Sequence, residues 1–236
     1  MLFKPFRAKI VLISRYNPNY TYSNKGEKME RIKTVLEKYK YFIKLKDLPR
    51  TGWETWNVQR KRRESVGEHV YATIMLAEAM YYAFNYDVDI YKVVFMLANH
   101  EIGEPKIGDF NPFQISREEK EKIEHAAVHE LFQNFKQAQP IEDAFLEFDA
   151  KLTKEAKFAF QCDKLECDLQ AAVYDQEGCI DLNNLQVNNA TENERVQKLL
   201  NSGDSWSHMW IKYDIDTIPY DENFLSVLNY VLENGI

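Results

Sequence analysis

The sequence predicts an all-α fold. Apolar residues recur at intervals of three and four over most of the chain, and two capping boxes, Ser65–Glu68 and Ser116–Glu119, mark helix starts. Strand patterns are almost absent, and the one candidate is the short run Lys9–Ser14. With 236 residues, of which 45% are hydrophobic and 14% aromatic, the chain is long enough to bury a sizeable core.

The expected helices follow from local signals taken in order along the chain. A helical pattern opens at Met29, and the Ser65 capping box precedes a long helix over residues 66–84. Asp89 caps a helix over residues 90–101, which belongs at the centre of the domain because it is apolar on almost every side. Further helices are expected after Ser116, over residues 141–148 behind Pro140, from Thr153 to about Tyr174, and from Asp221 to Leu232.

The chain is expected to hold one folded domain. Residues 17–26 are polar and rich in turn residues, and residues 1–28 are predicted to be an irregular N-terminal appendage. The helical domain then covers residues 29–236, with a core over 29–186 that carries the motifs and a C-terminal helical extension over 187–236. The apolar run Ile10–Ile13 is too short for a signal peptide, and no stretch approaches the roughly 20 apolar residues of a membrane span. We therefore expect a soluble cytoplasmic protein that does not bind membranes.

The net charge bears on the kind of binding partner, and the cysteine content bears on disulfide formation. The net charge of −7 argues against polymeric nucleic acid as a partner, but it leaves room for a small phosphorylated substrate held by a few local cations. The three cysteines, Cys162, Cys167 and Cys179, are odd in number and form no CxxC pair. They are predicted to be reduced thiols rather than a disulfide framework.

One set of side chains has the composition of a metal site. His69 lies early in the 66–84 helix, His100 and Glu101 end the next helix, and Asp163 lies in the helix that follows Thr153. Imidazole and carboxylate suit divalent cations such as Mn²⁺, Co²⁺, Zn²⁺, Fe²⁺ and Ni²⁺. Adjacent helical residues point about 100° apart, so His100 and Glu101 need ligands from other helices to complete a shell. Four ligands leave coordination positions open, which is typical of a catalytic site.

The order of these residues resembles the signature of the HD-domain superfamily of metal-dependent phosphohydrolases: a histidine, a histidine–acid pair and a distant aspartate. The resemblance is to its 5′-deoxynucleotidase-like branch and covers roughly residues 29–174. The stretches that carry it are LPRTGWETWNVQRKRRESVGEHV (48–70), MLANHEIGEPKIGD (96–109) and CDKLECDLQA (162–171). It implies an HD-domain-type helical bundle.

The resemblance also implies an activity: hydrolysis of nucleoside 5′-monophosphates, deoxynucleotides in particular, with one divalent ion (Mn²⁺, Co²⁺, Zn²⁺, Fe²⁺, Ni²⁺ or Mg²⁺). The implied metal ligands are His69, His100, Glu101 and Asp163. Glu104 would position or activate the attacking water or protonate the leaving oxygen, and Asp109 would contact the nucleotide or assist catalysis. Arg50 would contact the phosphate and Trp53 would pack against the sugar. The family also implies a homodimer.

Glu101 departs from the family pattern, which usually has an aspartate at this position. Its carboxylate sits one methylene further from the backbone, so metal binding is expected with altered geometry or metal preference. Two alternatives stay open. One is hydrolysis of another nucleotide, such as an alarmone, a cyclic nucleotide or a triphosphate. The other is a catalytically decayed metal- or nucleotide-binding module, against which the presence of Glu104 and Asp109 argues.

Three other features carry weaker signals. His125 and His129 lie four residues apart, and two histidines at this spacing can bind a metal. They lie outside the apolar face of their helix, however, and are expected to be solvated. The basic run 60–63 is expected to be a solvated loop, with a border of the phosphate entrance as the alternative. Trp206 and Trp210 suggest no chemistry.

Overall fold

The structure is a computed structural model that describes residues 25–133 and 135–236. The described residues are mainly α-helical, with a single isolated β-bridge, so the predicted all-α class is confirmed. The α-helices are α1 (Lys25–Phe42), α2 (Thr51–Thr55), α3 (Val66–Phe84), α4 (Ile90–Leu97), α5 (Glu104–Ile107), α6 (Arg117–Phe132), α7 (Gln139–Ala150), α8 (Lys154–Gln176), α9 (Glu194–Asn201), α10 (Trp206–Thr217) and α11 (Glu222–Asn234). Three 3-10 helices cover Ile43–Lys46, Lys136–Ala138 and Leu182–Asn184.

The described chain divides into two units, residues 25–39 and residues 40–236. The first is most of α1, and the second holds every other helix. The predicted strand over Lys9–Ser14 lies outside the described residues, as does the predicted appendage apart from its last four residues, which belong to α1. No helix in the described part of the chain is long and apolar enough to cross a membrane.

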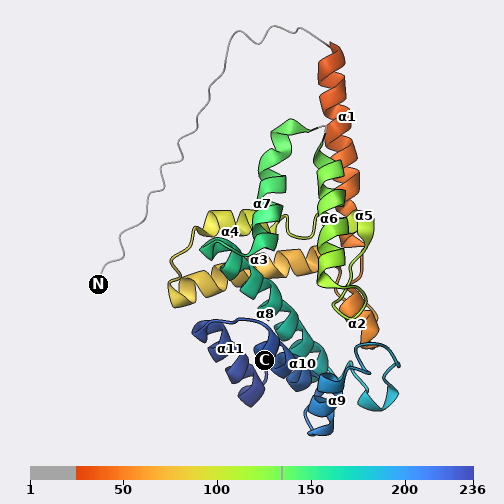
Figure 1. Cartoon of the computed structure of the whole chain (residues 1–236), viewed down its shortest axis with the longest axis vertical. Helices are drawn as coiled ribbons and strands as arrows, with labels where there is room; N and C mark the ends of the chain where they lie inside the picture. The colour runs from red at the N-terminus through yellow and green to blue at the C-terminus, as the bar shows by residue number, and fades with distance from the viewer. Residues whose placement is uncertain (1–24, 134) are drawn as a thin grey trace, which may run out of the picture. The chain divides into compact units, whose positions relative to one another are not determined.

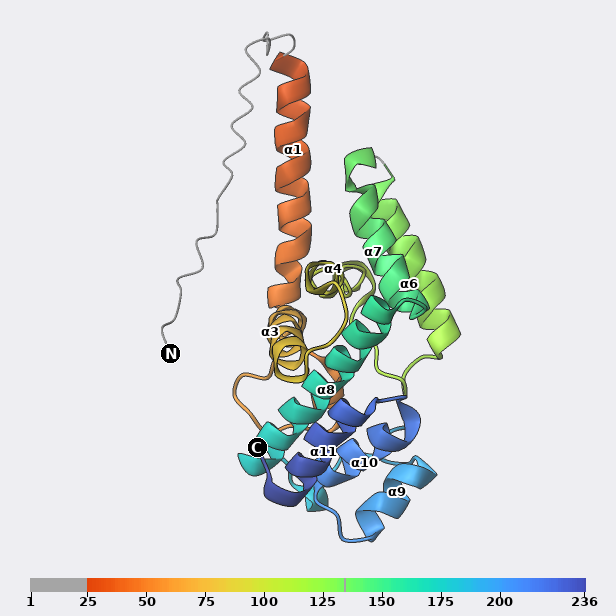
Figure 2. The same ribbon diagram turned by 90° about the vertical axis from the view of Figure 1, so that its left-hand side faces the viewer.

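α8 is the central helix of the second unit (Figures 1 and 2). It packs against α3, α4 and α7 as well as against α10 and α11. Its start is fixed by Thr153, whose Oγ1 accepts a hydrogen bond from the N–H of Ala156 at 3.2 Å. Leu97, Leu165 and Leu228, from three different helices, are fully buried in the core around it. Polar side chains carried by α8 are therefore held inside the protein.

The start of α3 is built by the predicted capping box. The N–H of Glu68 donates to Oγ of Ser65 at 3.3 Å, and the N–H of Ser65 donates to Oε2 of Glu68 at 3.0 Å. The chain around Pro49 lies alongside residues 64 and 65. Pro49 forms the isolated bridge with Ser65, and the N–H of Arg50 donates to the carbonyl of Glu64 at 3.2 Å. The chain around Arg50 is thus fixed beside the first turn of α3.

α4 ends at Leu97, four residues before the predicted end at Glu101. Two side chains explain the early stop. Nδ2 of Asn99 donates to the carbonyl of Phe95, and Nδ1 of His100 donates to the carbonyl of Leu97, both at 2.7 Å. These groups take the place of backbone N–H donors from a further helical turn. His100 and Glu101 consequently lie in a turn. The fixed angle of about 100° between adjacent helical side chains does not apply to them there.

The C-terminal extension packs on the chain around α2 through tryptophans. Trp206 and Trp210 come from α10, while Trp53 belongs to α2 and Trp56 follows it. The rings of Trp53 and Trp210 are 5.3 Å apart, and those of Trp56 and Trp206 are 6.0 Å apart. This contact joins segments separated by about 150 residues in the sequence.

The three cysteines, Cys162, Cys167 and Cys179, are buried free thiols. None of them forms a disulfide, in agreement with the prediction.

Candidate metal centre and its cavity

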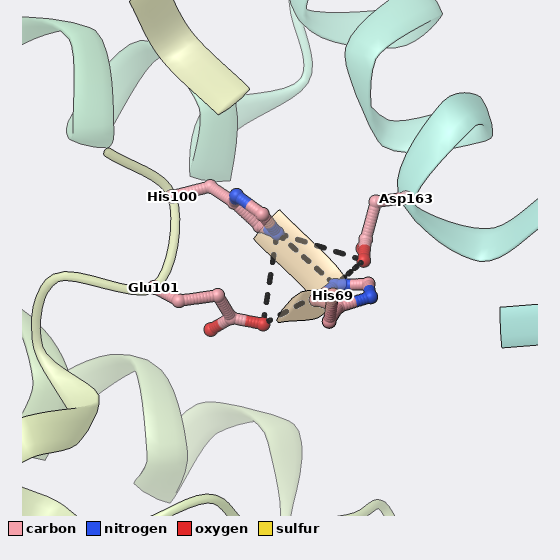
Figure 3. A group of neighbouring side chains, drawn as sticks. All are labelled: His69, His100, Glu101 and Asp163. Carbon is pink, nitrogen blue, oxygen red and sulfur yellow. Dashed lines mark hydrogen bonds and ion pairs between the residues drawn. The ribbon is translucent and has the colours of Figure 1, made fainter. Parts of the chain in front are cut away.

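Four predicted side chains of metal-ligand type meet in the interior (Figure 3). His69 comes from α3, Asp163 from α8, and His100 and Glu101 from the turn after α4. Each contributes one nitrogen or oxygen atom, and these four atoms all lie within 4.8 Å of one another. Every member is at most 8% exposed. These residues are called the four-ligand cluster below.

The distances within the cluster suit one small cation. Nε2 of His69 lies 3.0 Å from Oδ1 of Asp163 and 3.4 Å from Nε2 of His100. Oε1 of Glu101 lies 3.6 Å from Nε2 of His100 and 3.9 Å from Nε2 of His69. Ligand atoms about 2.1 Å from a tetrahedral ion are about 3.4 Å apart, so little adjustment would be needed. The donor set and its spacing therefore fit a divalent cation.

Both imidazoles present the same ring nitrogen to the cluster. Nδ1 of His69 lies 2.5 Å from Oε2 of Glu166, and Nδ1 of His100 lies 2.7 Å from the carbonyl of Leu97. Because carboxylate and carbonyl oxygens only accept, both Nδ1 atoms carry the proton and Nε2 faces the cluster. Burial and Arg50 lower the pKa of His69, but hydrogen bonds from its ring to two carboxylates outweigh them and raise it to about 9.

Glu101 reaches the cluster despite its longer side chain. It leaves the backbone from a turn, and the same Oε1 that faces the histidines lies 3.2 Å from Nη1 of Arg50. Burial alone would raise the pKa of Glu101, but positive charges led by those of His100 and Lys120 hold it far below its usual range. The carboxylate is therefore ionised, as a metal ligand must be.

Glu104, the first residue of α5, is enclosed next to the cluster. It is 1% exposed, its Oε1 lies 3.4 Å from Nζ of Lys120, and its Oε2 has no hydrogen-bond partner among the described residues. Burial raises its pKa well above the usual range, and the charges of Glu101 and Asp109 add to this. A buried oxygen without a partner points to a bound group, such as water or an ion, at this position.

The loop before Glu104 needs the glycine at position 103. A Cβ there would come within 2.6 Å of Cγ of Glu124, closer than real side chains approach. Glu124 belongs to α6, and its carboxylate lies within 4.8 Å of those of Glu101 and Glu104. The glycine thus allows α6 to approach the turn that carries two predicted site residues.

Arg50 and Asp109 are brought together at the cluster. Nη1 of Arg50 is 3.6 Å from Oδ1 of Asp109, and Nη2 is 3.2 Å from Sγ of Cys167. Oδ2 of Asp109 accepts hydrogen bonds from the N–H and the hydroxyl of Thr51, at 2.5 and 3.1 Å. Asp109 therefore fixes the start of α2, and with it the position of the Arg50 guanidinium.

Trp53 is almost fully buried, at 2% exposed. Its Nε1 donates to Oε2 of Glu64 at 3.0 Å, and its ring packs edge-on against Tyr174 at 5.1 Å. A small part of the side chain lines a cavity, so contact with a sugar there stays a prediction.

A cavity of about 500 Å³ adjoins the cluster. At one end it is lined by polar and charged residues: Arg50, Glu101, Asp109, Lys120 and Lys164. The remaining lining is largely aromatic and apolar, and much of it comes from α2 and α10. A charged end next to an aromatic region suits an amphipathic ligand with an anionic group.

Three residues beside the cluster were not predicted from the sequence. Glu166 contacts His69, Lys164 places Nζ 3.0 Å from Oδ2 of Asp163, and Lys120 contacts Glu104. Glu166 had a detectable signal, because it follows Asp163 by three residues and so shares its face of the helix. For the two lysines nothing in the local sequence distinguishes them from solvated side chains.

The other candidate groups lie outside the cluster. His125 Nε2 is 2.5 Å from Asp149 Oδ2, and His129 Nδ1 is 3.0 Å from Glu142 Oε1. Neither belongs to a group of side chains that could hold a metal among the described residues, and both are partly or fully exposed. The basic run 60–63 is mostly exposed and forms ion pairs with surface glutamates, in agreement with a solvated loop.

Comparisons with known proteins agree with this arrangement. The 5′-deoxynucleotidase HDDC2 of Dictyostelium discoideum is 32% identical over 150 residues, which are 60% of this chain and 78% of the relative. The human 5′-deoxynucleotidase HDDC2 is 31% identical over 147 residues, 61% of this chain and 69% of the relative. A "predicted metal-dependent phosphohydrolase" of Magnetospirillum magnetotacticum has a similar fold, with a TM-score of 0.57, 21% identity, and coverage of 87% of this chain and 93% of its own.

The resemblance inferred from the sequence motifs is thereby confirmed. The HD domain family matches residues 42–212, a span that contains the four-ligand cluster and most of the cavity lining. This chain belongs to the HD domain family.

Proposed function

We propose that this protein is a metal-dependent phosphohydrolase that removes phosphate from nucleoside 5′-monophosphates, with deoxynucleotides as preferred substrates. The observation that carries the proposal is a four-ligand cluster at the charged end of a cavity, with Arg50 against it. The similarity to several 5′-deoxynucleotidases supports the substrate class.

The proposed metal ligands are His69, His100, Glu101 and Asp163. When bound there, a divalent cation supplies positive charge that polarises a phosphoryl oxygen and makes water easier to deprotonate. The family points to a metal-dependent enzyme, and the buried donor set suits Mn²⁺, Co²⁺, Zn²⁺, Fe²⁺ or Ni²⁺, with Mg²⁺ as a further choice.

The protein's own groups would do the rest. The oxygen of a water molecule attacks phosphorus, the bond from phosphorus to the 5′ oxygen breaks, and the leaving oxygen takes up a proton. Glu104 is the proposed acid–base group, because its Oε2 is enclosed, has no partner within residues 25–133 and 135–236, and lies near the carboxylate of Glu101. Arg50 would hold the phosphate with its planar, two-point guanidinium.

Asp109 and Trp53 have supporting roles in this proposal. Asp109 contacts Arg50 and the start of α2, so it would hold the phosphate-binding arginine in place and border the nucleotide. Trp53 would contact the sugar with the part of its ring that lines the cavity. We also propose that the protein acts as a cytoplasmic homodimer, which size-exclusion chromatography with light scattering would test.

A phosphate-release screen tests the proposed function. Purified protein is freed of metal, supplied in turn with Mn²⁺, Co²⁺, Mg²⁺ or Zn²⁺, and offered ribo- and deoxynucleoside 5′-monophosphates. Cyclic nucleotides, nucleoside triphosphates and a guanosine tetraphosphate alarmone serve as competing substrates. We expect release from monophosphates, fastest from deoxynucleotides. Faster hydrolysis of a competing substrate would replace the proposed substrate class, and metal binding without any hydrolysis would favour a binding module.

A further inference from the structure

The cavity beside the four-ligand cluster also has an aromatic part. Besides the charged residues, its lining includes Trp210 and Tyr213 of α10 and Phe113 of the loop before α6. Trp210 and Tyr213 are three residues apart, so they lie on the same face of α10. We call these two side chains the α10 wall. It belongs to a segment for which the sequence suggested no chemistry.

Trp210 differs from the other tryptophans of the chain. Trp53, Trp56 and Trp206 are at most 4% exposed, whereas Trp210 is only partly buried and lines the cavity. Its ring packs 5.3 Å from that of Trp53 at 31°, and edge-on against Trp206 at 5.4 Å. Core aromatic rings thus hold its orientation while part of the indole remains open to a ligand.

Tyr213 is fixed in a similar way. The guanidinium of Arg195 lies over its ring at 5.2 Å, and the ring of Phe113 is 6.1 Å away. The nearby amide of Asn111 is already engaged: its Nδ2 donates to Oγ1 of Thr55, and its Oδ1 accepts from the N–H of Phe113. The amide of Asn111 therefore supports the loop, and the rings of the α10 wall are flat aromatic surfaces in the cavity lining.

The contacts from Arg50 through Trp53 to Trp210 set a direction along the cavity. Arg50 precedes α2 and contacts the four-ligand cluster, Trp53 follows one turn later, and Trp210 packs against Trp53. A ligand anchored by its phosphate at Arg50 would pass Trp53 and reach the α10 wall with its other end. Aromatic side chains bind nucleobases by stacking, which accepts every base because every base has a π face.

We propose that the α10 wall is the nucleobase-binding site and that Trp210 is its main stacking residue. This inference rests on the proposed function, because it takes the phosphate to be at the cluster. It adds a specificity: the base is recognised by its flat face, so the four common deoxynucleoside monophosphates gain similarly from it, and a sugar phosphate without a base is a poor substrate.

The kinetics of substrates with and without a nucleobase test the proposal. The kcat/KM values for four deoxynucleoside 5′-monophosphates are compared with that for 2-deoxyribose 5-phosphate, which keeps the phosphate and the sugar. Stacking on one base corresponds to about 5- to 150-fold, so we expect that advantage for the nucleotides in the unmodified protein. Trp210→Leu, which keeps apolar volume but loses the flat face, should bring the ratio close to one. Trp210→Phe should keep most of it.

Two results would overturn the proposal. One is a loss of the same factor on both kinds of substrate in Trp210→Leu, which would make Trp210 a general support of the site. The other is an unchanged kcat/KM for both kinds of substrate in that variant. Tyr82→Ala, at an aromatic side chain of α3 that is 72% exposed, is the matched control and should alter neither substrate.

Direct binding separates this proposal from the proposed function. Equilibrium dialysis with radiolabelled thymidine or deoxyadenosine needs no turnover. If the protein hydrolyses no monophosphate but binds both nucleosides, and Trp210→Leu weakens that binding, the base site stands while the hydrolase proposal fails. If the nucleosides bind Trp210→Leu as well as the unmodified protein, the base site fails whatever the activity.

Discussion

Oε2 of Glu166 lies 2.5 Å from Nδ1 of His69, on the side of the imidazole away from the Nε2 atom that contacts Asp163. A carboxylate in this position fixes a proton on Nδ1 and leaves Nε2 as the ring atom that a bound cation would contact. Glu166 thereby orients a proposed metal ligand without belonging to the four-ligand cluster.

Glu166→Ala should therefore weaken metal binding by about 10- to 100-fold. Glu166→Gln should lose less, because its amide oxygen can still accept from Nδ1. Competition with a chelating dye measures the affinity, and circular dichroism checks the fold. The matched control is Glu177→Gln, an exposed carboxylate just after the same helix that pairs with Arg60. Equal metal affinity in Glu166→Ala and the control would contradict this role.

Replacement of Arg50 should impair substrate binding and turnover together. Hydrogen bonds to charged groups contribute about 1.5–3 kcal/mol, so Arg50→Ala should lower kcat/KM for nucleotides by about 10- to 150-fold. Arg50→Lys should recover little, because an ammonium group cannot make two parallel contacts with phosphate. Steady-state kinetics measure both variants. Recovery of full activity by the lysine variant would show that charge alone suffices.

Glu104→Gln should separate catalysis from metal binding. The amide keeps the shape of the side chain but cannot exchange a proton, so kcat should fall by about 10²- to 10⁴-fold, the usual contribution of a general acid–base group. Bound metal, measured by elemental analysis, should stay the same. A variant that lost its metal along with its activity would place Glu104 among the ligands instead.

Two neighbouring carboxyl groups, Asp168 of α8 and Asp214 of α10, predict a pH effect on stability. Asp168 is fully buried, its Oδ2 accepts from the hydroxyl of Tyr220 at 2.7 Å, and its Oδ1 lies in contact with no N–H or O–H donor among the described residues. Burial, followed by the nearby charge of Asp214, raises the pKa of Asp168 well above its usual range. The pKa of Asp214 is raised to about 6, chiefly by burial. Asp168 is therefore protonated, and its O–H donates a hydrogen bond to the carboxylate of Asp214, which accounts for the Oδ1 atom that has no other donor.

The sign of the pH effect follows from this proton. The unfolded chain releases it near the ordinary aspartate pKa of about 4, whereas the folded protein keeps it to higher pH, so the stability from this carboxyl falls as pH rises above about 4. Asp168→Asn can make both hydrogen bonds without titrating. The free energy of unfolding of Asp168→Asn, minus that of the unmodified protein, should therefore increase between about pH 4 and pH 8. Urea unfolding at several pH values measures the difference, and a difference that did not change with pH would contradict the shared proton.

Asp168→Ala serves as the contrasting variant. It leaves the buried hydroxyl of Tyr220 without its acceptor, which should cost about 1–3 kcal/mol at every pH. A loss in Asp168→Asn as large as in Asp168→Ala would mean that packing, and not the hydrogen bonds, explains the residue.

Five helix starts could be predicted because their signals are local. Ser65, Asp89, Ser116, Thr153 and Asp221 all cap the helices that follow them, each through its own side chain. The end of α4 could not, since the predicted continuation is apolar and helical in pattern. It stops because Asn99 and His100 turn their side chains back onto carbonyls of the last turn, a choice that depends on the packing of the neighbouring chain.

The four-ligand cluster could be predicted from the order of its residues, whereas its surroundings could not. Lys120 reaches Glu104 from α6, and Trp210 reaches Trp53 across about 150 residues of sequence. Contacts of this kind depend on how whole helices pack, and no short pattern records them. Trp53 shows the same limit, because its sequence neighbourhood did not reveal that most of its ring would be core.

The four tryptophans of this chain, Trp53, Trp56, Trp206 and Trp210, all lie in one aromatic cluster that borders the cavity. No indole elsewhere contributes to the emission of the protein. Tryptophan fluorescence, excited selectively, is thus a local optical probe of this region, and its quenching can follow ligand entry in the unlabelled protein.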